Sequence, residues 1–285
     1  MLKKKDLVKI KKPKNSNTIF GLPAKSYIDE NFWKKECETV LSNGWLFVGL
    51  AHELKKAGDV IPLFIANKPV LLVKNDNNEI SAFHNVCSHR CLKLVDQKMN
   101  VGKIIRCPYH AWSYDLDGKL KAAPHVGGTD QHKPKGFDFS KHGLKSIRIH
   151  VWNDWVFINF NGKAKKFEDY ARPLIQKFDD IDLTKLKYVT TLDFGKINTN
   201  WKFIIENFIE PYHVQFVHKT TTNQPLKDHY IIVDGICNGS GVDVKKEDNK
   251  NENALSVSSK YLSLFPNFII GTYFPNQVGV YLNIP

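Results

Sequence analysis

The chain has 285 residues, enough for roughly two domains. Apolar residues make up 42% of it and charged residues 25%, an ordinary balance for a globular protein, which argues against disorder along its whole length. The formal net charge of +12 comes from scattered Lys and a dense basic start. Such a charge suits an acidic protein partner, although a solvated Lys-rich surface explains it as well.

Several classes of function are not expected. Basic and aromatic residues do not alternate in a stacking pattern, so nucleic acid is not predicted as a partner. No apolar run reaches about 18 residues and none follows the basic start, so neither membrane insertion nor secretion is predicted. The five cysteines do not resemble a disulfide framework, and free thiols of this kind indicate a cytoplasmic protein.

Residues 1–44 are predicted to form a tail and then a helix that packs on the C-terminal domain. Ser26 and Asp29 are candidate N-caps, and Asn43-Gly44 marks the end of the helix. Its apolar residues recur at helical spacing: Phe32, Trp33, Cys37 and Val40.

Residues 45–162 change to short β-rich runs separated by turns, which predicts an all-β domain. Asp117-Gly118 is a hairpin signal within this domain. The candidate strands are LFVGL, VIPLFIA, PVLLVK, EISAFHNV, KIIRCP, SYDLDGKL, KSIRIHV and WVFINF.

Residues 163–285 begin with helical periodicity and end with alternation typical of paired strands. The helical runs are FEDYARPLIQKFDDIDL and NTNWKFIIENFIEPYHVQFVHK, the second with Trp201, Ile204, Ile205 and Phe208 on one side. Residues 240–259 are polar and are expected to form an exposed loop. The fold class is therefore α+β: an all-β domain, then a domain of helices and antiparallel sheet.

A first group of metal-ligand residues lies in two of the β-domain loops. Cys87-x-His89 and Cys107-x-x-His110 each supply one thiolate and one imidazole. Zinc is a competing metal, but zinc fingers usually pair like ligands within each arm. The mixed arms instead favour a [2Fe–2S] cluster in which one iron takes both thiolates and the other both imidazoles. Such ligation raises the reduction potential to about −150 to +300 mV, from about −400 mV for all-Cys clusters.

At these residues the chain resembles the Rieske proteins, and Arg90 with the run CPYH-x-W-x-YDLDG resembles their oxygenase branch. Two positions depart from the family pattern. Cys91 and Ala111 stand where the family usually has Gly. Cys91 is interpreted as a small buried residue that fills the glycine position, with a fifth thiol near the cluster as the alternative. Cluster binding does not depend on either change.

A second group lies in the run ENFIEPYHVQFVHK. His213 and His218 would point about 140° apart on a straight helix, so they can share one ion only if the helix ends or bends, for which Pro211 supplies a cause. Glu206, Glu210 and His213 fall at i, i+4 and i+7, one stripe of a continuous helix. Carboxylates on that stripe need a metal or an imidazole partner unless they form a solvated acidic face. Two imidazoles with an open position favour iron that activates O2.

This second run resembles the catalytic domain of the Rieske non-heme iron oxygenase alpha subunits, in its N-W-K, E-N and acid-x-Y-H-x4-H pattern. By that resemblance His213 and His218 bind a mononuclear Fe(II), and Glu210 bridges to the cluster ligand His110 of a neighbouring chain. Asn207 matches a position that supports the iron site. The similarity extends from about Phe32 to the end of the chain.

The resemblance implies a terminal oxygenase that hydroxylates a small organic substrate with O2. Electrons come from NAD(P)H through a reductase or ferredoxin, reach the cluster, and pass through His110 and Glu210 to the iron. Because that bridge joins two chains, a homotrimer is implied.

The family's third iron ligand is a carboxylate well downstream of the two histidines, and the chain ends before that region. Asp228, Asp234 and Asp243 follow His218, but each comes earlier than the family pattern places the ligand. We therefore expect a sequence truncated at its C-terminus, with residues 163–285 forming part of the iron domain.

Glu at position 210 in the EPYH context resembles the branch of monooxygenases that act on choline, betaine or carnitine. An aromatic-ring-hydroxylating dioxygenase is the alternative. A Rieske electron-transfer protein without oxygenase activity is an alternative of a different class, and a structural zinc module is a third. A quaternary ammonium group calls for an aromatic cage. The candidate residues are Tyr212, Phe216, Tyr261, Phe265 and Tyr273.

Overall fold

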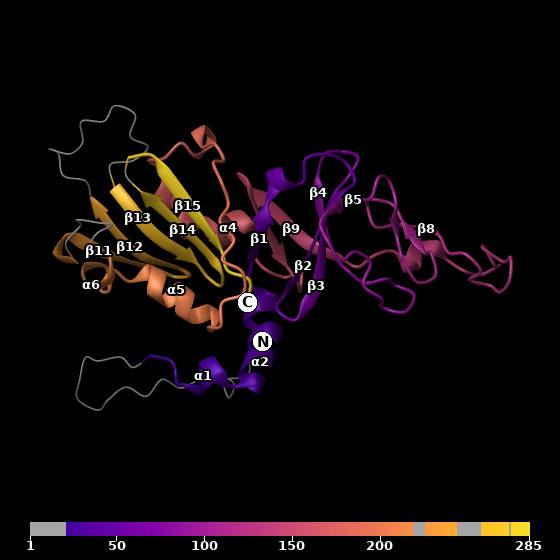
Figure 1. Ribbon diagram of the computed structural model, residues 1–285, viewed down its shortest axis with the longest axis horizontal. Helices are drawn as coiled ribbons and strands as arrows, with labels where there is room; N and C mark the ends of the chain where they lie inside the picture. Colours follow the sequence, from indigo (N-terminus) through magenta and orange to yellow (C-terminus); the bar gives the residue numbers. More distant parts are fainter. Residues whose placement is uncertain (1–20, 219–225, 244–257, 274) are drawn as a thin grey trace.

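The computed structural model describes residues 21–218, 226–243, 258–273 and 275–285. Two sheet-bearing regions lie end to end along the long axis of the molecule, and a small third sheet lies beyond one of them (Figure 1). No helix of the described part of the chain is long and apolar enough to cross a membrane.

The first region is a seven-stranded sheet with the order β1-β10-β9-β4-β3-β2-β5, in which the paired strands are antiparallel. Its strands are rich in apolar and β-branched residues, which suit a pleated, partly buried surface, and β1, β3 and β10 are the most deeply buried. The strands are β1 (Leu46–Leu50), β2 (Asp59–Ile65), β3 (Lys68–Lys74), β4 (Ile80–His84), β5 (Met99–Asn100), β9 (Ser146–Trp152) and β10 (Trp155–Asn159).

A three-stranded sheet extends from this region and carries the second cluster loop. Its strands are β6 (Ile105–Arg106), β7 (Ser113–Tyr114) and β8 (Leu120–Ala122). The predicted Asp117-Gly118 turn joins β7 and β8, with Gly118 at a φ of +78° that glycine adopts at little cost. Buried Val60, Leu71 and Tyr114 share one apolar core, so the small sheet packs on the larger one.

The second region is a five-stranded antiparallel sheet in sequence order, with one helix on each face. Its strands are β11 (His229–Asp234), β12 (Cys237–Asp243), β13 (Ser258–Leu264), β14 (Phe268–Tyr273) and β15 (Gln277–Leu282). Helix α4 (Phe167–Ile175) packs against Ile270, and helix α5 (Trp201–Ile209) packs in the core that holds Ile269. Ile269 and Ile270 are neighbours on β14, and side chains of neighbouring strand residues point to opposite faces of a sheet. The two helices therefore cover opposite faces of the five-stranded sheet.

One core joins the two regions. Phe47 and Phe157 of the first sheet pack with Phe268 of the second. The Asn267 side chain, fully buried, accepts a hydrogen bond from the Phe47 N–H (2.9 Å) and donates one to the Phe47 carbonyl (2.8 Å). This pairing of a side-chain amide with strand backbone satisfies polar groups that burial would otherwise leave costly.

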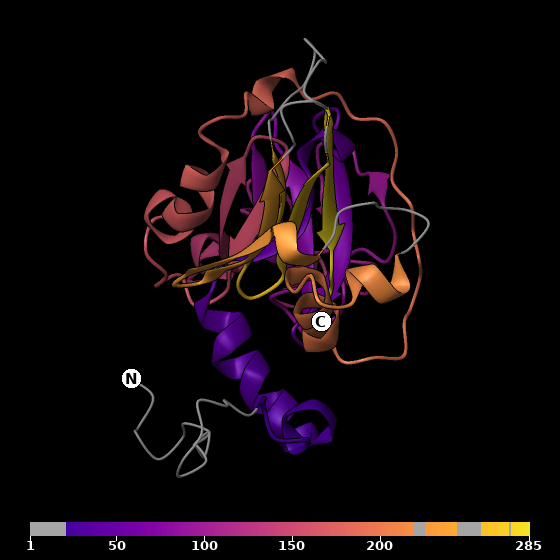
Figure 2. The ribbon, with the colours of Figure 1, turned by 90° about the vertical axis from the view of Figure 1, so that its left-hand side faces the viewer.

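The N-terminal helical segment is three short helices rather than the one predicted. They are α1 (Lys25–Ile28), α2 (Glu30–Glu38) and α3 (Val40–Asn43), and Figure 2 shows them projecting below the two sheets. Asp29 caps α2 as predicted, because its carboxylate accepts from the Phe32 N–H at 2.8 Å. Asp29 has an extended backbone, so the helix that begins at Lys25 ends at Ile28 and a new one begins at Glu30. Ser26 is buried inside α1 and is not a cap, so that expectation was wrong.

Two other expectations need correction. Residues 240–243 belong to β12, and Ser258 and Ser259 to β13, where Ser240 and both of these serines are buried, so these residues are not an exposed loop. Residues 244–257 lie outside the described residues. The predicted long second helix also divides, into α5 and α6 (Val214–Val217). Short 3-10 helices occur at 51–53, 139–142, 176–178, 183–185 and 226–228.

Candidate metal centres

The first cluster loop is closed by two backbone hydrogen bonds. The Cys87 N–H donates to the Leu92 carbonyl at 2.8 Å, and the Cys91 N–H donates to the Cys87 carbonyl at 2.9 Å. Cys91 is exposed, so the expectation that it is a buried residue was wrong. It has a φ of +56°, in the left-handed region that L-amino acids rarely occupy. The family's usual Gly at this position therefore has a structural reason.

The second loop repeats this design. The Cys107 N–H donates to the Trp112 carbonyl at 2.8 Å, and the Ala111 N–H donates to the Cys107 carbonyl at 3.1 Å. Ala111 also has a φ of +56°. Because the two loops have the same backbone geometry, each can direct one Cys and one His at a single group bound between them.

The four predicted ligands meet between these loops. Cys87 and Cys107 are buried, and the rings of His89 and His110 lie with centroids 4.9 Å apart. His110 Nδ1 is buried and has no hydrogen-bond partner, which is costly unless a ligand satisfies it. Two buried thiols, two imidazoles and an unsatisfied ring nitrogen fit a cluster with S2N2 ligation.

Hydrogen bonds and rings surround these ligands. The Tyr114 hydroxyl lies 3.2 Å from Cys87 Sγ and 2.9 Å from Ser88 Oγ. Burial, and next the bond to Cys87, raises the pKa of Tyr114 well above its usual value, so the phenol keeps its proton. His89 stacks on Trp112 at 4.7 Å, and burial lowers the pKa of His89, which favours the neutral imidazole that metal ligation requires.

The second pair of histidines lies where a helix ends. Helix α5 stops at Ile209, Glu210 is extended, and the chain turns at Pro211 before α6 begins. His213 and His218 flank α6, with ring centroids 5.2 Å apart and planes at 68°. The break removes the angular separation that a continuous helix would impose.

Glu210 orients one of these imidazoles. Its Oε1 lies 2.6 Å from His213 Nδ1, and its Oε2 accepts from the backbone N–H of Tyr212 at 2.5 Å. A carboxylate on Nδ1 fixes the ring orientation and leaves Nε2 for a metal. Glu206 does not share this site. Its carboxylate accepts from the Tyr27 hydroxyl at 2.8 Å, so the predicted single stripe was wrong because the helix ends between Glu206 and Glu210.

The N-terminal helices hold the helix that leads to this site, a role that the sequence analysis missed. Lys202 Nζ lies 2.9 Å from both carboxylate oxygens of Glu36, and both side chains are buried. The Trp201 indole N–H also donates to Glu36, at 3.4 Å. The Tyr27 ring stacks on Phe203 at 4.3 Å. The sequence around Lys202 carries no local signal for this pairing, because its partner Glu36 lies 166 positions away.

The remaining candidates are dispersed. Asn207 is exposed on α5, and among the described residues no hydrogen bond joins it to either histidine. Asp234 pairs with Lys177 at 3.2 Å, and Asp243 lies 3.4 Å from the Tyr230 hydroxyl. Asp228 ends a 3-10 helix before β11. The described residues therefore do not bring a third carboxylate ligand to the histidine pair.

The cage candidates separate into three places. Tyr261 and Tyr273 contact each other at 5.5 Å, joined by two residues that the prediction missed, Phe208 and Tyr281. Tyr212, just before α6, and Phe216 within α6 form a separate exposed pair. Phe265 lies against Trp201 instead.

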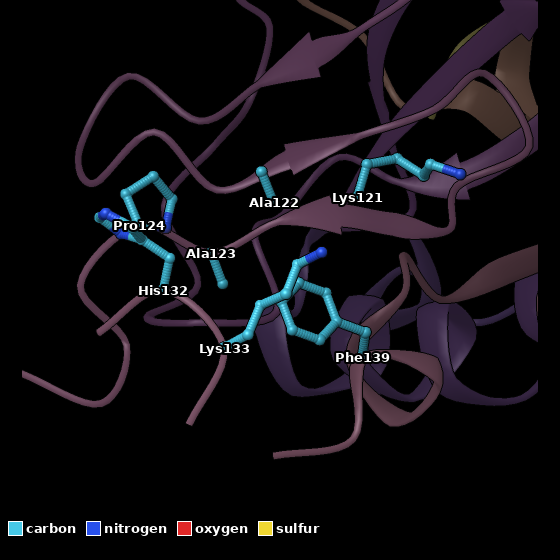
Figure 3. Close-up of a pocket in the computed structure, with 7 residues that line it drawn as sticks. All are labelled: Lys121, Ala122, Ala123, Pro124, His132, Lys133 and Phe139. Carbon is cyan, nitrogen blue, oxygen red and sulfur yellow. The ribbon is translucent and has the colours of Figure 1, made fainter. Parts of the chain in front are cut away.

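The β8 loop holds a surface hollow and a histidine cluster outside both sites. Figure 3 shows the hollow, a cavity of about 260 Å³ with Lys121, His132 and Phe139 in its lining. Exposed His125, Asp130 and His132 come together beside it. Both imidazole Nδ1 atoms already accept backbone N–H groups, at 2.9 and 3.0 Å, so their lone pairs are in use.

The fold and the two groups of side chains define a class, a protein in which an all-β region brings two Cys and two His together and a helix-and-sheet region carries a pair of His. Comparison with known proteins agrees. Residues 44–133 match the Rieske [2Fe-2S] domain, and residues 178–285 match the ring hydroxylating alpha subunit catalytic domain. The chain belongs to the Rieske non-heme iron oxygenase alpha subunits.

Two sequence relatives and one crystal structure are similar to this chain. The glycine betaine monooxygenase oxygenase subunit of Pseudomonas aeruginosa is 32% identical over 200 residues, which cover 70% of this chain and 45% of that protein. The salicylate 5-hydroxylase large oxygenase component of a Ralstonia species is 31% identical over 206 residues, 69% of this chain and 48% of that protein. This chain thus spans about half the length of these relatives.

A crystal structure of the quaternary ammonium Rieske monooxygenase CntA, in complex with an inhibitor, has the same fold. Its TM-score is 0.77 at 20% identity, over 90% of this chain and 69% of that chain.

Proposed function

We propose that this chain acts in a terminal oxygenase component, which hydroxylates an organic substrate with O2 and with electrons that originate from NAD(P)H. The observation that carries the proposal is the pair of centres in one chain. Cys87, His89, Cys107 and His110 converge in one domain, and the Glu210-oriented His213 lies beside His218 in the other. The domain limits proposed are 1–44, 45–162 and 163–285.

Each group of residues has a separate role in this proposal. When bound, a [2Fe–2S] cluster at Cys87, His89, Cys107 and His110 would supply one-electron transfer, and iron at His213 and His218 would supply O2 activation. Glu210 holds the His213 ring by its Nδ1. Asn207 is proposed to support the same helix end.

A homotrimer is proposed, and the separation of the two centres within one chain supports association of neighbouring chains. In Figure 1 α6 lies at one end of the molecule and β8 lies toward the other, so the centres of one chain do not adjoin. Tyr109, beside His110, is 58% exposed, and Phe216 beside the histidine pair is also 58% exposed. Association of neighbouring chains would cover both apolar surfaces and bring Glu210 to the His110 of the next chain.

The electron donor is proposed to be a reductase or ferredoxin with an acidic surface. The net charge of +12 supports a partner of opposite sign. A cytoplasmic location is proposed because none of the five cysteines forms a disulfide, as expected in a reducing compartment.

A quaternary ammonium substrate is the preferred assignment, supported by the similarity to a glycine betaine monooxygenase and by Glu at position 210. The test is O2 uptake by the purified chain with a donor system, in the presence of glycine betaine or salicylate. Uptake stimulated by glycine betaine, with formaldehyde released as an N-methyl group is oxidised, is the expected result. Stimulation by salicylate alone would favour aromatic-ring hydroxylation, which the Ralstonia relative supports.

The electron-transfer alternative has less support. A carrier has no need for a second centre, whereas His213 is held by a carboxylate in the manner of a metal ligand. Iron analysis separates the two functions, since a carrier needs only the two irons of the cluster.

A further inference from the structure

The surface hollow beside β8 belongs to neither metal centre. Its volume is about 260 Å³, and its lining comes from β8, from residues 123–133 and from the 3-10 helix at 139–142 (Figure 3). An apolar cavity of about 150 Å³ is enough to hold a benzene ring. The hollow therefore has room for a compact hydrocarbon group with one polar head group beside it.

The charged part of this lining is entirely positive. Lys121 and Lys133 contribute ammonium groups, and among the described residues that line the hollow none is acidic. Lys133 is exposed and takes part in no ion pair within the described part of the chain. Lys121 Nζ lies 4.0 Å from Asp115 Oδ2, too far for a hydrogen bond. Both ammonium groups thus remain available to an anion in the hollow.

His132 adds a neutral donor to the same lining. Its Nδ1 accepts the His125 N–H at 3.0 Å, so the hydrogen of the neutral ring is on Nε2. An Nε2–H group donates to an oxygen acceptor and offers nothing to a cation. A carboxylate only accepts hydrogen bonds, so it fits this set of donors, whereas an ammonium or guanidinium group does not.

The remainder of the lining is apolar and rests on the core of the cluster domain. It consists of Ala122, Ala123, Pro124 and Phe139. Ala123 is buried in the core that also contains Cys87 and Cys107, and Phe139 packs against that core. The Phe137 ring meets Phe139 edge to face at 5.1 Å between centroids. A hydrocarbon group in the hollow would therefore contact a supported apolar wall, and none of the four candidate cluster ligands lines it.

The wall formed by residues 123–133 is held in one tight conformation. His125 and Asp130 have φ of +55° and +57°, a left-handed backbone that a non-Gly residue keeps only where its surroundings fix it. The Gly127 N–H donates to the Gln131 carbonyl at 3.0 Å, which closes the loop. Gly127 also packs so closely that an added Cβ would lie 2.6 Å from Pro134. Backbone strain of this kind is common where a loop binds a ligand, which supports a ligand site here.

We propose that this hollow binds a small organic carboxylate, with its hydrocarbon group on the apolar wall and its carboxylate at Lys121 and Lys133. The site is separate from both metal centres, so the proposal does not depend on the proposed function. A free small molecule fits better than an acidic protein surface, because the hollow is concave and its apolar wall requires a hydrocarbon group next to the negative charge.

The experiment compares three ligands of nearly equal shape on the purified protein. Cyclohexanecarboxylate, cyclohexanecarboxamide and cyclohexanecarboxamidine share one hydrocarbon ring and are negative, neutral and positive at pH 7. None is an arene or a quaternary ammonium compound, so binding at a site for either substrate class is not expected. Titration calorimetry should show the carboxylate binding about tenfold more tightly than the amide, the scale of two partly exposed ion pairs, and the amidine more weakly than the amide. Equal affinity for the three ligands would overturn the proposal.

Substitutions in the hollow then assign the binding to its lining. Lys121→Gln/Lys133→Gln removes both charges and should bring the affinities for the carboxylate and the amide within about twofold of each other. Ala122→Phe places a ring in the hollow from an exposed residue of β8 and should weaken both ligands about tenfold. Carboxylate binding that survives both changes would lie elsewhere on the protein and would overturn the proposal.

The matched control is Lys98→Gln/Lys103→Gln, which removes two exposed charges from the same domain outside the hollow. It should leave the preference for the carboxylate unchanged. An equal loss of preference in this control would show a general effect of charge and would also contradict the site. Every substituted side chain is exposed, so the far-UV circular dichroism of all three variants should match that of the parent protein.

Discussion

Cys91 and Ala111 stand at equivalent points of the two cluster loops, each at a φ of +56°. The family pattern has Gly at both positions, and the structure gives the reason. A left-handed conformation costs an L-residue about 1 kcal/mol or more, and Gly does not pay this cost. The loops keep their shape despite this cost because two backbone hydrogen bonds close each of them.

Replacement of either residue by Gly should therefore stabilise the protein. We expect Cys91→Gly and Ala111→Gly each to raise the free energy of unfolding by up to about 1 kcal/mol. The gain stays small because Gly has more entropy in the unfolded chain, which offsets part of the relief in the folded state. Urea denaturation of the cluster-free protein measures the change. The reverse control is Gly102→Ala, at a φ of +66° with open space around it, which should destabilise. A loss of stability in both Gly variants would contradict this account.

The Tyr114 hydroxyl, 3.2 Å from Cys87 Sγ, should tune a bound cluster. A donor to the thiolate stabilises the reduced, more negative state, so Tyr114→Phe should lower the reduction potential. The shift should be on the order of 60 mV, the one-electron equivalent of a hydrogen bond worth about 1.4 kcal/mol. Redox titration by EPR measures it. Tyr109→Phe, at an exposed tyrosine, is the control and should leave the potential unchanged.

Among the secondary-structure elements, the break between α5 and α6 is what allows the rings of His213 and His218 to lie side by side. The spacing of His213 and His218 was sufficient to predict that a helix must end or bend, and Pro211 indicated where. Periodicity alone did not reveal that Glu206 turns to Tyr27 while Glu210 turns to His213. A stripe on a helical wheel assumes a continuous helix, and the assumption fails once the helix ends at Ile209.

The buried pair of Glu36 and Lys202 joins α2 to α5, and it should respond differently to single and double changes. Glu36→Ala should cost about 3–5 kcal/mol because it leaves a buried ammonium without its partner. The double variant Glu36→Leu with Lys202→Met should recover most of that loss. Chemical denaturation measures both. Glu53→Gln, in an exposed pair with Lys98, should cost below about 1 kcal/mol, and a similar small cost for Glu36→Ala would contradict the argument.

For the whole molecule, local patterns predicted much of the fold. The alternating runs marked the long strands, and the mixed Cys-His arms marked the cluster loops. Long-range contacts were not predictable in this way. Asn267 pairs with Phe47 across 220 positions, and Lys202 with Glu36 across 166, and neither residue carries a local signal for its partner. Of the aromatic residues, Phe208 and Tyr281 were missed because sheet register and helix packing, not sequence spacing, bring them to Tyr261.

The central claim is that one chain holds both a Rieske cluster and a mononuclear iron. It is tested most directly by iron and acid-labile sulfide analysis of anaerobically purified protein, with EPR of the dithionite-reduced sample. The account predicts about three irons and two sulfides per chain, falling to about two irons in His213→Ala/His218→Ala with the cluster signal retained. Cys87→Ser with Cys107→Ser should lose the cluster signal and the sulfide. Two irons in the parent protein, unchanged by the histidine substitutions, would contradict the account.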